Sequence, residues 1–455
     1  MRKNLNLPLY IIIFYLIFTL VIYIAGPFNW ITYNPIYFWG LQLLYLSMII
    51  FGWKKGVQKK QNNIWSSKWD LLIIKYLRPL LIINFIYELV NIFRRFGFSN
   101  FNFIGLINKV VYGLFHMGES YNTFQESIGE VSGADLLGGN LFTVFNLIWE
   151  CVAFLVLLLS IIYFKKLTKR YKVITISTIL ISILAYLSTG TNIGLFRIIF
   201  PSIIIFIMKL YKKSLIWDRS KKKRLMKIIL VIVGISFILV AFIFDMTMKS
   251  RGGILYFNDS SYNIGGISLN KDSIFFKIVP ESLYMLLVAG AAYLTQGYYG
   301  MSLCLRIKWI PTFGIGSSMY LQKFFSKYIT DDFLLNSYQS RLQEFGWDPD
   351  IRWHSAYSWI ANDVSFLGVG IIIFAFAYLF AMAYKDVLET DNPFAITLVC
   401  LLSLAVFFIP CNNQLFQTPY TMFAFFVTLI LWRATKANTK IYKWSKSIYA
   451  KVKQK

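Results

Sequence analysis

Repeated apolar runs of about 20 residues are the feature that most constrains how this chain can fold. In a lipid bilayer such a run is stable as a helix, because a helix satisfies its own backbone hydrogen bonds. The composition, 57% hydrophobic and 15% charged, agrees with an all-α polytopic membrane protein of about 10–12 transmembrane helices. We expect spans at 8–25, 35–53, 69–93, 141–164, 173–190, 192–211, 225–245, 364–385, 394–411 and 417–434.

Lysine and arginine, which give the chain a net charge of +25, concentrate in short segments beside these runs. Short cytoplasmic loops carry this excess in membrane proteins, and they face anionic lipid. We therefore expect both chain ends to be cytoplasmic and loops 94–140 and 246–362, which hold 12 of the 21 acidic residues, to lie outside. The charge is then a topology signal, and no nucleic-acid partner is expected. The basic segments are 54–68, 165–172, 209–227 and 433–455.

The predicted spans and loops divide the chain into four parts. One segment of the large outer loop, 281–305, is apolar enough to enter the membrane. A single extra crossing there would place the basic tail outside, so we expect a re-entrant or interfacial segment, or one of a pair of crossings. The parts are the N-terminal membrane helices in 1–245, the large loop 246–362, the C-terminal membrane helices in 363–435 and a basic cytoplasmic tail in 436–455.

Several common enzyme sites lack their motifs in this sequence. The two histidines lie in different loops, and neither CxxC nor HExxH occurs, so we expect no tightly bound metal. There is no GxSxG nucleophile elbow and no P-loop for ATP. We therefore expect no cofactor.

Arginines in the large loop are the first candidate binding groups. Arg251 lies in KSRGG, Arg341 in SYQSRLQEFG and Arg352 directly before the span 364–385. Arginine is always charged and can bind phosphate oxygens in pairs, so several arginines at one face suit a diphosphate. The alternative is that each is a solvated side chain paired with an acidic neighbour such as Asp348 or Asp350.

His354 is the second candidate, in the sequence RWHSAYSW. A histidine there could donate to a phosphate oxygen or accept a proton from a sugar hydroxyl. The neighbouring Trp353 and Tyr357 could stack on sugar rings, although an aromatic belt at the membrane surface explains them equally well. A purely structural histidine is the alternative reading for His354.

Charged residues inside the apolar runs form a third group. Such residues are costly in lipid and must face protein or water. Arg197, just after the turn STGTN, is close enough to the outer surface to help hold a lipid headgroup. Among the others, Lys75 and Arg78 could mark a polar cavity, and snorkelling or ion pairing between helices would account for them equally well. The others are Lys75, Arg78, Glu88 and Glu150.

This pattern resembles the bacterial oligosaccharide repeat-unit polymerases, the O-antigen polymerase or Wzy-type family. The segment LAYLSTGTNIGLFRIIFPSIIIF at 184–206 is similar to a small-residue turn and arginine of that family. A large outer loop lies late in the chain, and Arg352 and Gly368 reproduce the R-x15-G spacing of some members. The companion R-x10-G pattern is absent near Arg251, which makes the role of that arginine less secure.

The resemblance implies an architecture like that of the lipid-dependent, GT-C-like polymerases and ligases. It implies a metal-independent glycosyltransferase that joins undecaprenyl-diphosphate-linked oligosaccharide units at the periplasmic face of the bacterial inner membrane. A chain-length regulator of the same pathway is a further expected partner. A lipid-linked oligosaccharide flippase and an O-antigen ligase remain alternatives. The expected site comprises His354, Arg352 and Arg341 as catalytic residues, Arg251, Arg197, Tyr357 and Trp353 as substrate-binding residues, and Glu344 or Asp363 as a candidate base.

Overall fold

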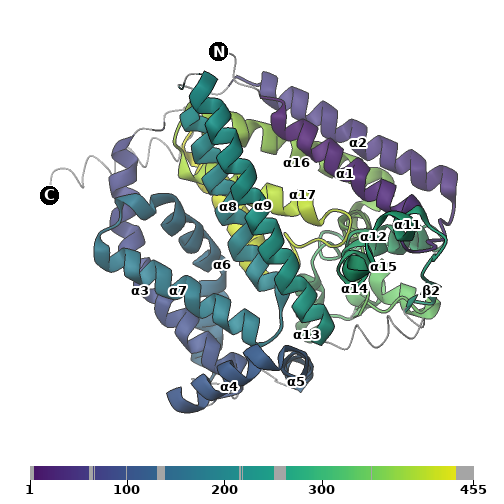
Figure 1. Cartoon of the computed structure of the whole chain (residues 1–455), viewed down its shortest axis with the longest axis horizontal. Helices are drawn as coiled ribbons and strands as arrows, with labels where there is room; N and C mark the ends of the chain where they lie inside the picture. The colour runs from purple at the N-terminus through teal and green to yellow at the C-terminus, as the bar shows by residue number, and fades with distance from the viewer. Residues whose placement is uncertain are drawn as a thin grey trace.

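The computed structural model describes residues 5–60, 65, 67–98, 100–130, 139–214, 217, 219–250, 263–349 and 351–436. The regular structure in these residues is almost entirely helical (Figure 1). The long helices are α1 (Leu7–Ala25), α2 (Pro35–Gln58), α3 (Ser67–Arg95), α6 (Gly139–Tyr163), α7 (Lys169–Ser188), α8 (Asn192–Ser214), α9 (Arg219–Ser250), α12 (Tyr284–Cys304), α16 (Ala356–Glu389), α17 (Pro393–Phe408) and α18 (Pro419–Ala434). The shorter elements are α4 (Phe103–Phe115), α5 (Met117–Glu130), η1 (Phe164–Lys166), β1 (Asn263–Ile264), β2 (Ile267–Ser268), α11 (Ile274–Ile278), η2 (Glu281–Leu283), α13 (Met319–Tyr328), α14 (Asp332–Leu335), α15 (Tyr338–Arg341) and η3 (Leu342–Phe345).

Six helices in the described part are long and apolar enough to cross a membrane: α1, α2, the Ile148–Lys166 stretch, α7, α8 and α16. The expectation of a helical, membrane-embedded protein is therefore confirmed. The other four predicted spans are also helices, but they are not among the six. α3 carries several charges, and α17 and α18 have 16 residues each, about 24 Å, which is shorter than the hydrocarbon core. Ten crossings remain a prediction.

Side-chain hydrogen bonds gather one end of α2, α3, α6, α8, α16 and α18 together, and we call it the basic end. Except at α16, these helix ends adjoin the basic segments of the sequence. The structure thus places the lysine-rich helix ends together, as the charge pattern predicts, while their cytoplasmic location remains a prediction. The bonds join Tyr163 to Asp70 (2.7 Å), Lys212 to Asp391 (2.7 Å), Trp432 to Asp386 (2.7 Å) and Lys385 to the Val57 carbonyl (2.9 Å).

The opposite end, which we call the loop end, contains the two predicted outer loops. Their described residues form the short helices α4, α5, α11 and α13–α15, the longer α12, and a hairpin of β1 and β2. The predicted membrane segment 281–305 is α12, and it is not among the six candidate spans. Tyr298 of α12 hydrogen-bonds Thr19 of α1 at 3.0 Å, and Trp30 donates to Thr295 at 2.9 Å. α12 therefore packs against the protein, with fifteen of its 21 residues buried.

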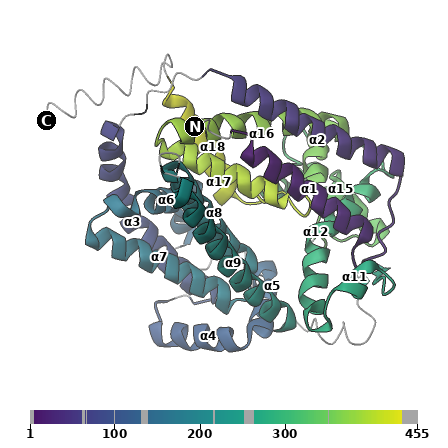
Figure 2. The ribbon, with the colours of Figure 1, turned by 45° about the horizontal axis from the view of Figure 1, so that its top comes forward.

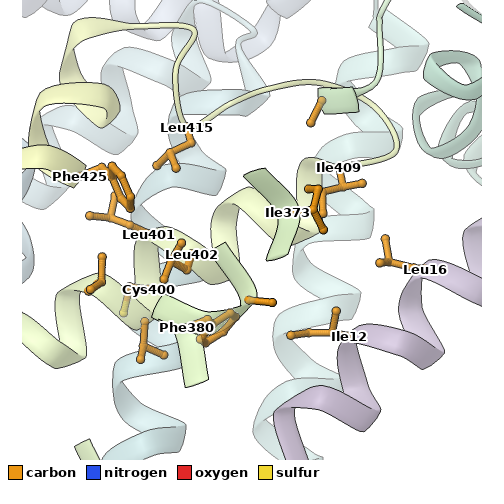
Figure 3. Close-up of a cluster of buried hydrophobic side chains, with 14 of the residues drawn as sticks. Ile12, Leu16, Ile373, Phe380, Cys400, Leu401, Leu402, Ile409, Leu415 and Phe425 are labelled. Carbon is orange, nitrogen blue, oxygen red and sulfur yellow. The ribbon is translucent and has the colours of Figure 1, made fainter. Parts of the chain in front are cut away.

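α17 lies in the centre of the apolar core (Figure 3), where twelve of its sixteen residues are buried. Leu402 of α17 faces Phe380 of α16, and side chains of α1 and α18, such as Ile12 and Phe425, close the cluster. A 16-residue helix that is surrounded by protein has no need to match the bilayer thickness. This burial explains how so short a helix is stable.

α2 and α16 pack at close range through two glycines of α2. A Cβ at Gly52 would lie 2.3 Å from the Phe374 carbonyl oxygen, and one at Gly56 would lie 2.5 Å from that of Tyr378. Residues four apart share one helix face, and small residues there let two backbones approach closely within a membrane. The Gly52-x3-Gly56 spacing thus fixes α2 against α16.

α16 is broken near its loop end at Ser365, whose backbone angles are φ 62° and ψ 167°. Only glycine adopts this conformation freely, so the surrounding contacts must hold it. The Asn362 carbonyl, three residues earlier, accepts from Trp309 Nε1 at 3.0 Å and from the Thr312 amide at 3.2 Å. Loop 305–318 therefore donates the hydrogen bonds that the Asn362 carbonyl accepts beside the break in α16.

Replacing Gly52 or Gly56 with leucine should force α2 and α16 apart. We expect a loss of roughly 1–3 kcal/mol in the free energy of unfolding, the usual range for overpacking. The measurement is thermal unfolding of the purified protein in detergent. Gly234→Leu in α9 is the matched control, because no heavy atom lies within 4 Å of the Cβ position there. Equal unfolding temperatures for all three variants would contradict the close α2–α16 contact.

Candidate functional site

The loop between α17 and α18, residues 409–418, is buried near the loop end although it is not helical. Its Ile409 carbonyl accepts the amide of Ala356, the first residue of α16, at 2.9 Å. Asn413 Nδ2 donates to the Ser317 carbonyl at 2.9 Å. Non-helical backbone at membrane depth is stable only inside protein or beside an aqueous cavity. The α17–α18 loop therefore lies inside the protein, in a part of the interior that contains polar groups.

Arg197 of α8 lies beside this loop. Its Nη2 donates to Gln414 Oε1 at 3.0 Å, and its Nε is buried without a hydrogen-bond partner. Glu150 of α6 lies within electrostatic range of Arg197. Among the described residues, Glu150 accepts two long hydrogen bonds, both 3.5 Å, from Tyr87 and Asn146. The carboxylate and the guanidinium thus both have bonding capacity left.

Other polar atoms on α6 and on the α17–α18 loop also lack partners. Both amide atoms of Gln417 and the Oδ1 of Asn146 are buried without a hydrogen bond. A buried polar group without a partner costs about 1–3 kcal/mol, so several together indicate a place where a polar ligand completes the bonding. We call this group the Arg197 cluster. It comprises Asn146, Glu150, Arg197, Gln414 and Gln417.

The Arg197 cluster lies near the loop end rather than at mid-membrane. Arg197 is five residues from the start of α8, about 8 Å along the helix, and Glu150 is at the loop-end side of the Ile148–Lys166 span. Tyr320 of α13 lies within electrostatic range of Glu150, and its ring contacts Phe423 of α18 at 6.4 Å. α13 therefore lies over the cluster at the loop end.

The turn between α7 and α8 fixes the start of α8 and hence the position of Arg197. Gly190 has φ +58°, and a Cβ there would lie 2.5 Å from the Met117 carbonyl oxygen, so glycine is required. Arg95 of α3 donates to Thr189 at 2.8 Å and to Thr191 at 2.7 Å. Arg95 thus holds the turn STGTN against α3.

His354 lies just before α16, among the rings of Tyr293, Trp353 and Trp359, and we call this place the aromatic junction. The His354 side chain is 1% exposed, and its ring meets Trp359 edge-on at 6.3 Å. Gly300 of α12 leaves room for Trp347 beside it, since a Cβ there would lie 2.9 Å from Trp347 Nε1. The half-buried Trp353 meets Tyr293 edge-on at 4.6 Å. This junction thus contains Trp353 and His354, two predicted site residues that are neighbours in the sequence.

Burial of His354 bears on its predicted role as a base. It lowers the pKa of the imidazole from 6.5 to about 3, so the ring is neutral at physiological pH. Both ring nitrogens are buried without a hydrogen-bond partner. A group with so low a pKa accepts a proton poorly, which argues against general-base catalysis by His354. Tyr357 is also buried, 4.4 Å from the Tyr45 ring, so its face packs in the core and is not open to a sugar.

The predicted arginines have different partners. The Arg352 guanidinium lies 6.0 Å from the Trp347 ring, and Arg341 donates to the Lys308 carbonyl at 2.7 Å. Arg197 belongs to its own cluster, and Arg251 lies outside the described residues. The described arginines thus lie on separate elements with separate partners, and their convergence on one diphosphate stays a prediction.

The two candidate bases differ in environment. Glu344 is exposed on η3. Asp363 is saturated with hydrogen bonds that tie loop 305–318 to α16, which argues against its acting as a base. Its Oδ1 accepts from Thr312 Oγ1 (2.6 Å) and the amides of Gly314 (2.8 Å) and Gly316 (3.0 Å), and its Oδ2 accepts from the Ser317 amide (2.9 Å) and hydroxyl.

The prediction from sequence missed Glu150, Gln414 and Gln417 as site residues. Glu150 did carry a signal, because a carboxylate inside an apolar run has to face protein or water. The two glutamines carried none, since amides in a short connecting segment are common. No group of three or more His, Cys, Asp or Glu side chains in the described residues is arranged to hold a metal ion.

Comparisons with known proteins identify no relative. No family model, no curated protein and no solved structure matches the chain. The site is therefore interpreted from its own geometry.

The buried His354 should make the protein less stable in mild acid. Between pH 6.5 and about 3 the unfolded chain binds a proton at this residue that the folded chain does not. The free energy of unfolding should therefore fall by about 1.4 kcal/mol per pH unit as pH drops through that window. His354→Gln should show a flatter pH dependence of the unfolding temperature from pH 6.5 to 4. His116→Gln, an exposed histidine, is the control, and identical profiles for all three proteins would refute the assignment.

Proposed function

We propose that this protein is a membrane glycosyltransferase that polymerises undecaprenyl-diphosphate-linked oligosaccharide units into O-antigen or capsular polysaccharide. The observation that carries the proposal is Arg197, a half-buried arginine whose Nε–H is buried without a partner, near the loop end of the candidate membrane span α8. Such a group suits an anion that a lipid brings to the membrane surface. The Wzy-type resemblance of the sequence, which includes the turn before Arg197, supports the same reaction.

The chemistry divides between Arg197 and Glu150. The acceptor hydroxyl attacks the anomeric carbon of the donor sugar, and the bond from that carbon to the diphosphate oxygen breaks. The diphosphate leaves with the electron pair, so negative charge grows on its oxygens. Fixed donors aimed at that charge lower the barrier, and the Arg197 guanidinium supplies them. The proton of the hydroxyl passes to Glu150, whose carboxylate is only weakly hydrogen-bonded.

The location of the cluster supports a reaction at the outer surface. It lies near the loop end, away from the lysine-rich helix ends, which the positive-inside rule assigns to the cytoplasm. The proposal therefore puts the site at the periplasmic face of the bacterial inner membrane. There the lipid diphosphate of the donor lies at the level of the phospholipid headgroups, close to the depth of Arg197.

A lipid-linked oligosaccharide flippase is the second candidate. Glu88 and Arg95 on α3 lie within electrostatic range of one another and are half-buried in the helix bundle. A transporter needs such charges along its path. One observation argues against the flippase. The Arg95 guanidinium already donates hydrogen bonds to Thr189 and Thr191, so it holds the turn between α7 and α8 in place.

The polymerase proposal predicts that Arg197→Ala and Arg197→Lys both lose about 10²–10³ of the rate with purified lipid-linked units. Lysine should fail because one ammonium cannot replace a planar guanidinium with several donors. Glu150→Gln should lower the rate while leaving substrate binding intact. The readout is the length distribution of the product formed from repeat units isolated from a host strain that lacks the protein.

Arg170→Ala, an exposed arginine at the basic end, is the matched control and should be fully active. Monodisperse behaviour and an unchanged unfolding temperature must accompany each variant, so that misfolding is not read as lost catalysis. Full-length polymer from Arg197→Ala would overturn the proposed site. If the wild-type protein moves labelled lipid-linked units across vesicles and makes no polymer, the flippase is correct. Transfer of polymer to a lipid A core acceptor would indicate the ligase.

A further inference from the structure

An open groove of about 710 Å³ lies between the loop-end parts of α2 and α16. Gly40 keeps it open, because nothing lies within 4 Å of its Cβ position. The lining along α2 covers about 16 Å of helix, roughly one leaflet of the membrane. The lining residues are Asn34, Pro35, Ile36, Tyr37, Gly40, Leu41, Leu44 and Leu367.

The groove faces the lipid. Both helices that form it are candidate membrane spans, and Ile36 and Leu367 are 91% and 61% exposed. A hydrocarbon chain therefore fills it in the membrane. Its narrow lining, one stretch of α2 and one residue of α16, suits a single chain.

Cationic groups lie at the mouth of the groove. Asn34, which lines it, donates to the Leu305 carbonyl at 2.8 Å and so holds the start of loop 305–318 there. The next residue, Arg306, is exposed, and its guanidinium lies between the rings of Tyr33 (4.6 Å) and Phe345 (4.5 Å). These two rings hold the charge in place at the membrane surface.

Arg341 adds a second fixed cation. It donates to the Lys308 carbonyl at 2.7 Å, and Tyr338 lies within electrostatic range of both Arg341 and the groove residue Tyr37. None of the ion pairs among the described residues includes Arg306, Lys308 or Arg341. We call these three the basic rim. An apolar groove with unpaired cations at its mouth is complementary to a lipid with a strongly anionic headgroup.

We infer that this groove holds the isoprenoid chain of the acceptor, with its diphosphate on the basic rim. The inference rests on the proposed function. A polyprenyl diphosphate has one chain and more charge than the single phosphate of a phospholipid, so it suits both a one-chain groove and three cations. Arg306 and Arg341 can bind two phosphate oxygens each.

The chemistry of polymerisation explains why this second site is separate from the Arg197 cluster. The donor reacts at the sugar next to its diphosphate, so its leaving group must lie in the reacting centre. The acceptor reacts at its other end, a whole repeat unit away from its own diphosphate. Its lipid anchor must therefore sit elsewhere on the same face. Figures 1 and 2 both show α2 and α6, the helix of Glu150, on different sides of the molecule.

Photo-crosslinking tests the inference on the full-length protein in phosphatidylcholine nanodiscs. The probe is undecaprenyl diphosphate with a diazirine in its isoprenoid chain, and labelled peptides are identified by mass spectrometry. We expect labelling within residues 34–44 and at Leu367. Gly40→Trp, which fills the groove, and the double variant Arg306→Glu/Lys308→Glu should each reduce it by about tenfold or more. Gly234→Trp, the same change at a glycine of α9 whose Cβ position has no heavy atom within 4 Å, should leave it unchanged.

The outcomes separate this inference from the proposed function. In polymerisation assays, Gly40→Trp should raise the KM for the acceptor and leave the KM for the donor near its wild-type value. Labelling that is spread over all lipid-facing helices, or that excess phosphatidylglycerol removes, would overturn the groove as a polyprenyl-diphosphate site. Specific labelling by a protein that makes no polymer would support the lipid site and overturn the polymerase.

Discussion

In hydrocarbon, every backbone N–H and C=O group must find a partner inside the protein, and the interior of this molecule is organised around that requirement. α17 and α18 are each shorter than the hydrocarbon core is thick, and the segment that joins them is not helical. Neighbours form hydrogen bonds with several of its polar groups. The Ile409 carbonyl accepts from the amide at the start of α16, the Asn413 side chain donates to loop 305–318, and the Gln414 side chain accepts from Arg197. The α17–α18 loop thus connects the aromatic junction with the Arg197 cluster. Side-chain atoms without a partner remain at both places: the ring nitrogens of His354 at the junction, and Arg197 Nε and the Gln417 amide at the cluster.

On the α2–α16 side too, a loop forms hydrogen bonds with a helix that is not continuous. Loop 305–318 draws on the backbone of α16 at Asn362 and on the carboxylate of Asp363, and the helix breaks at Ser365 two residues later. The same loop supplies Arg306 and Lys308 to the basic rim. Farther along the two helices, Gly52 and Gly56 hold α2 against α16. Close packing at one end and a broken helix at the other explain why the groove opens only toward the loop end.

Hydropathy and charge predicted the helical class, the long helices and the gathering of lysine-rich ends, because those follow from local composition. They could not show that 281–305 is packed against protein or that α17 is enclosed, since burial among helices leaves the same apolar pattern as burial in lipid. For the site, Arg197 was predicted from its place after STGTN. His354 and Asp363 were singled out for chemistry, yet one is a buried neutral ring and the other a saturated carboxylate. Such roles depend on long-range partners, which spacing along the chain does not reveal.

The central claim is that the Arg197 guanidinium binds the leaving diphosphate of a lipid-linked donor. An electron cryo-microscopy structure in nanodiscs with a non-transferable analogue of that donor tests this most directly. The account predicts diphosphate density within hydrogen-bonding distance of Arg197, with the first sugar beside Glu150. Density for the donor diphosphate on Arg352 or beside His354, with the Arg197 cluster unchanged, would contradict it.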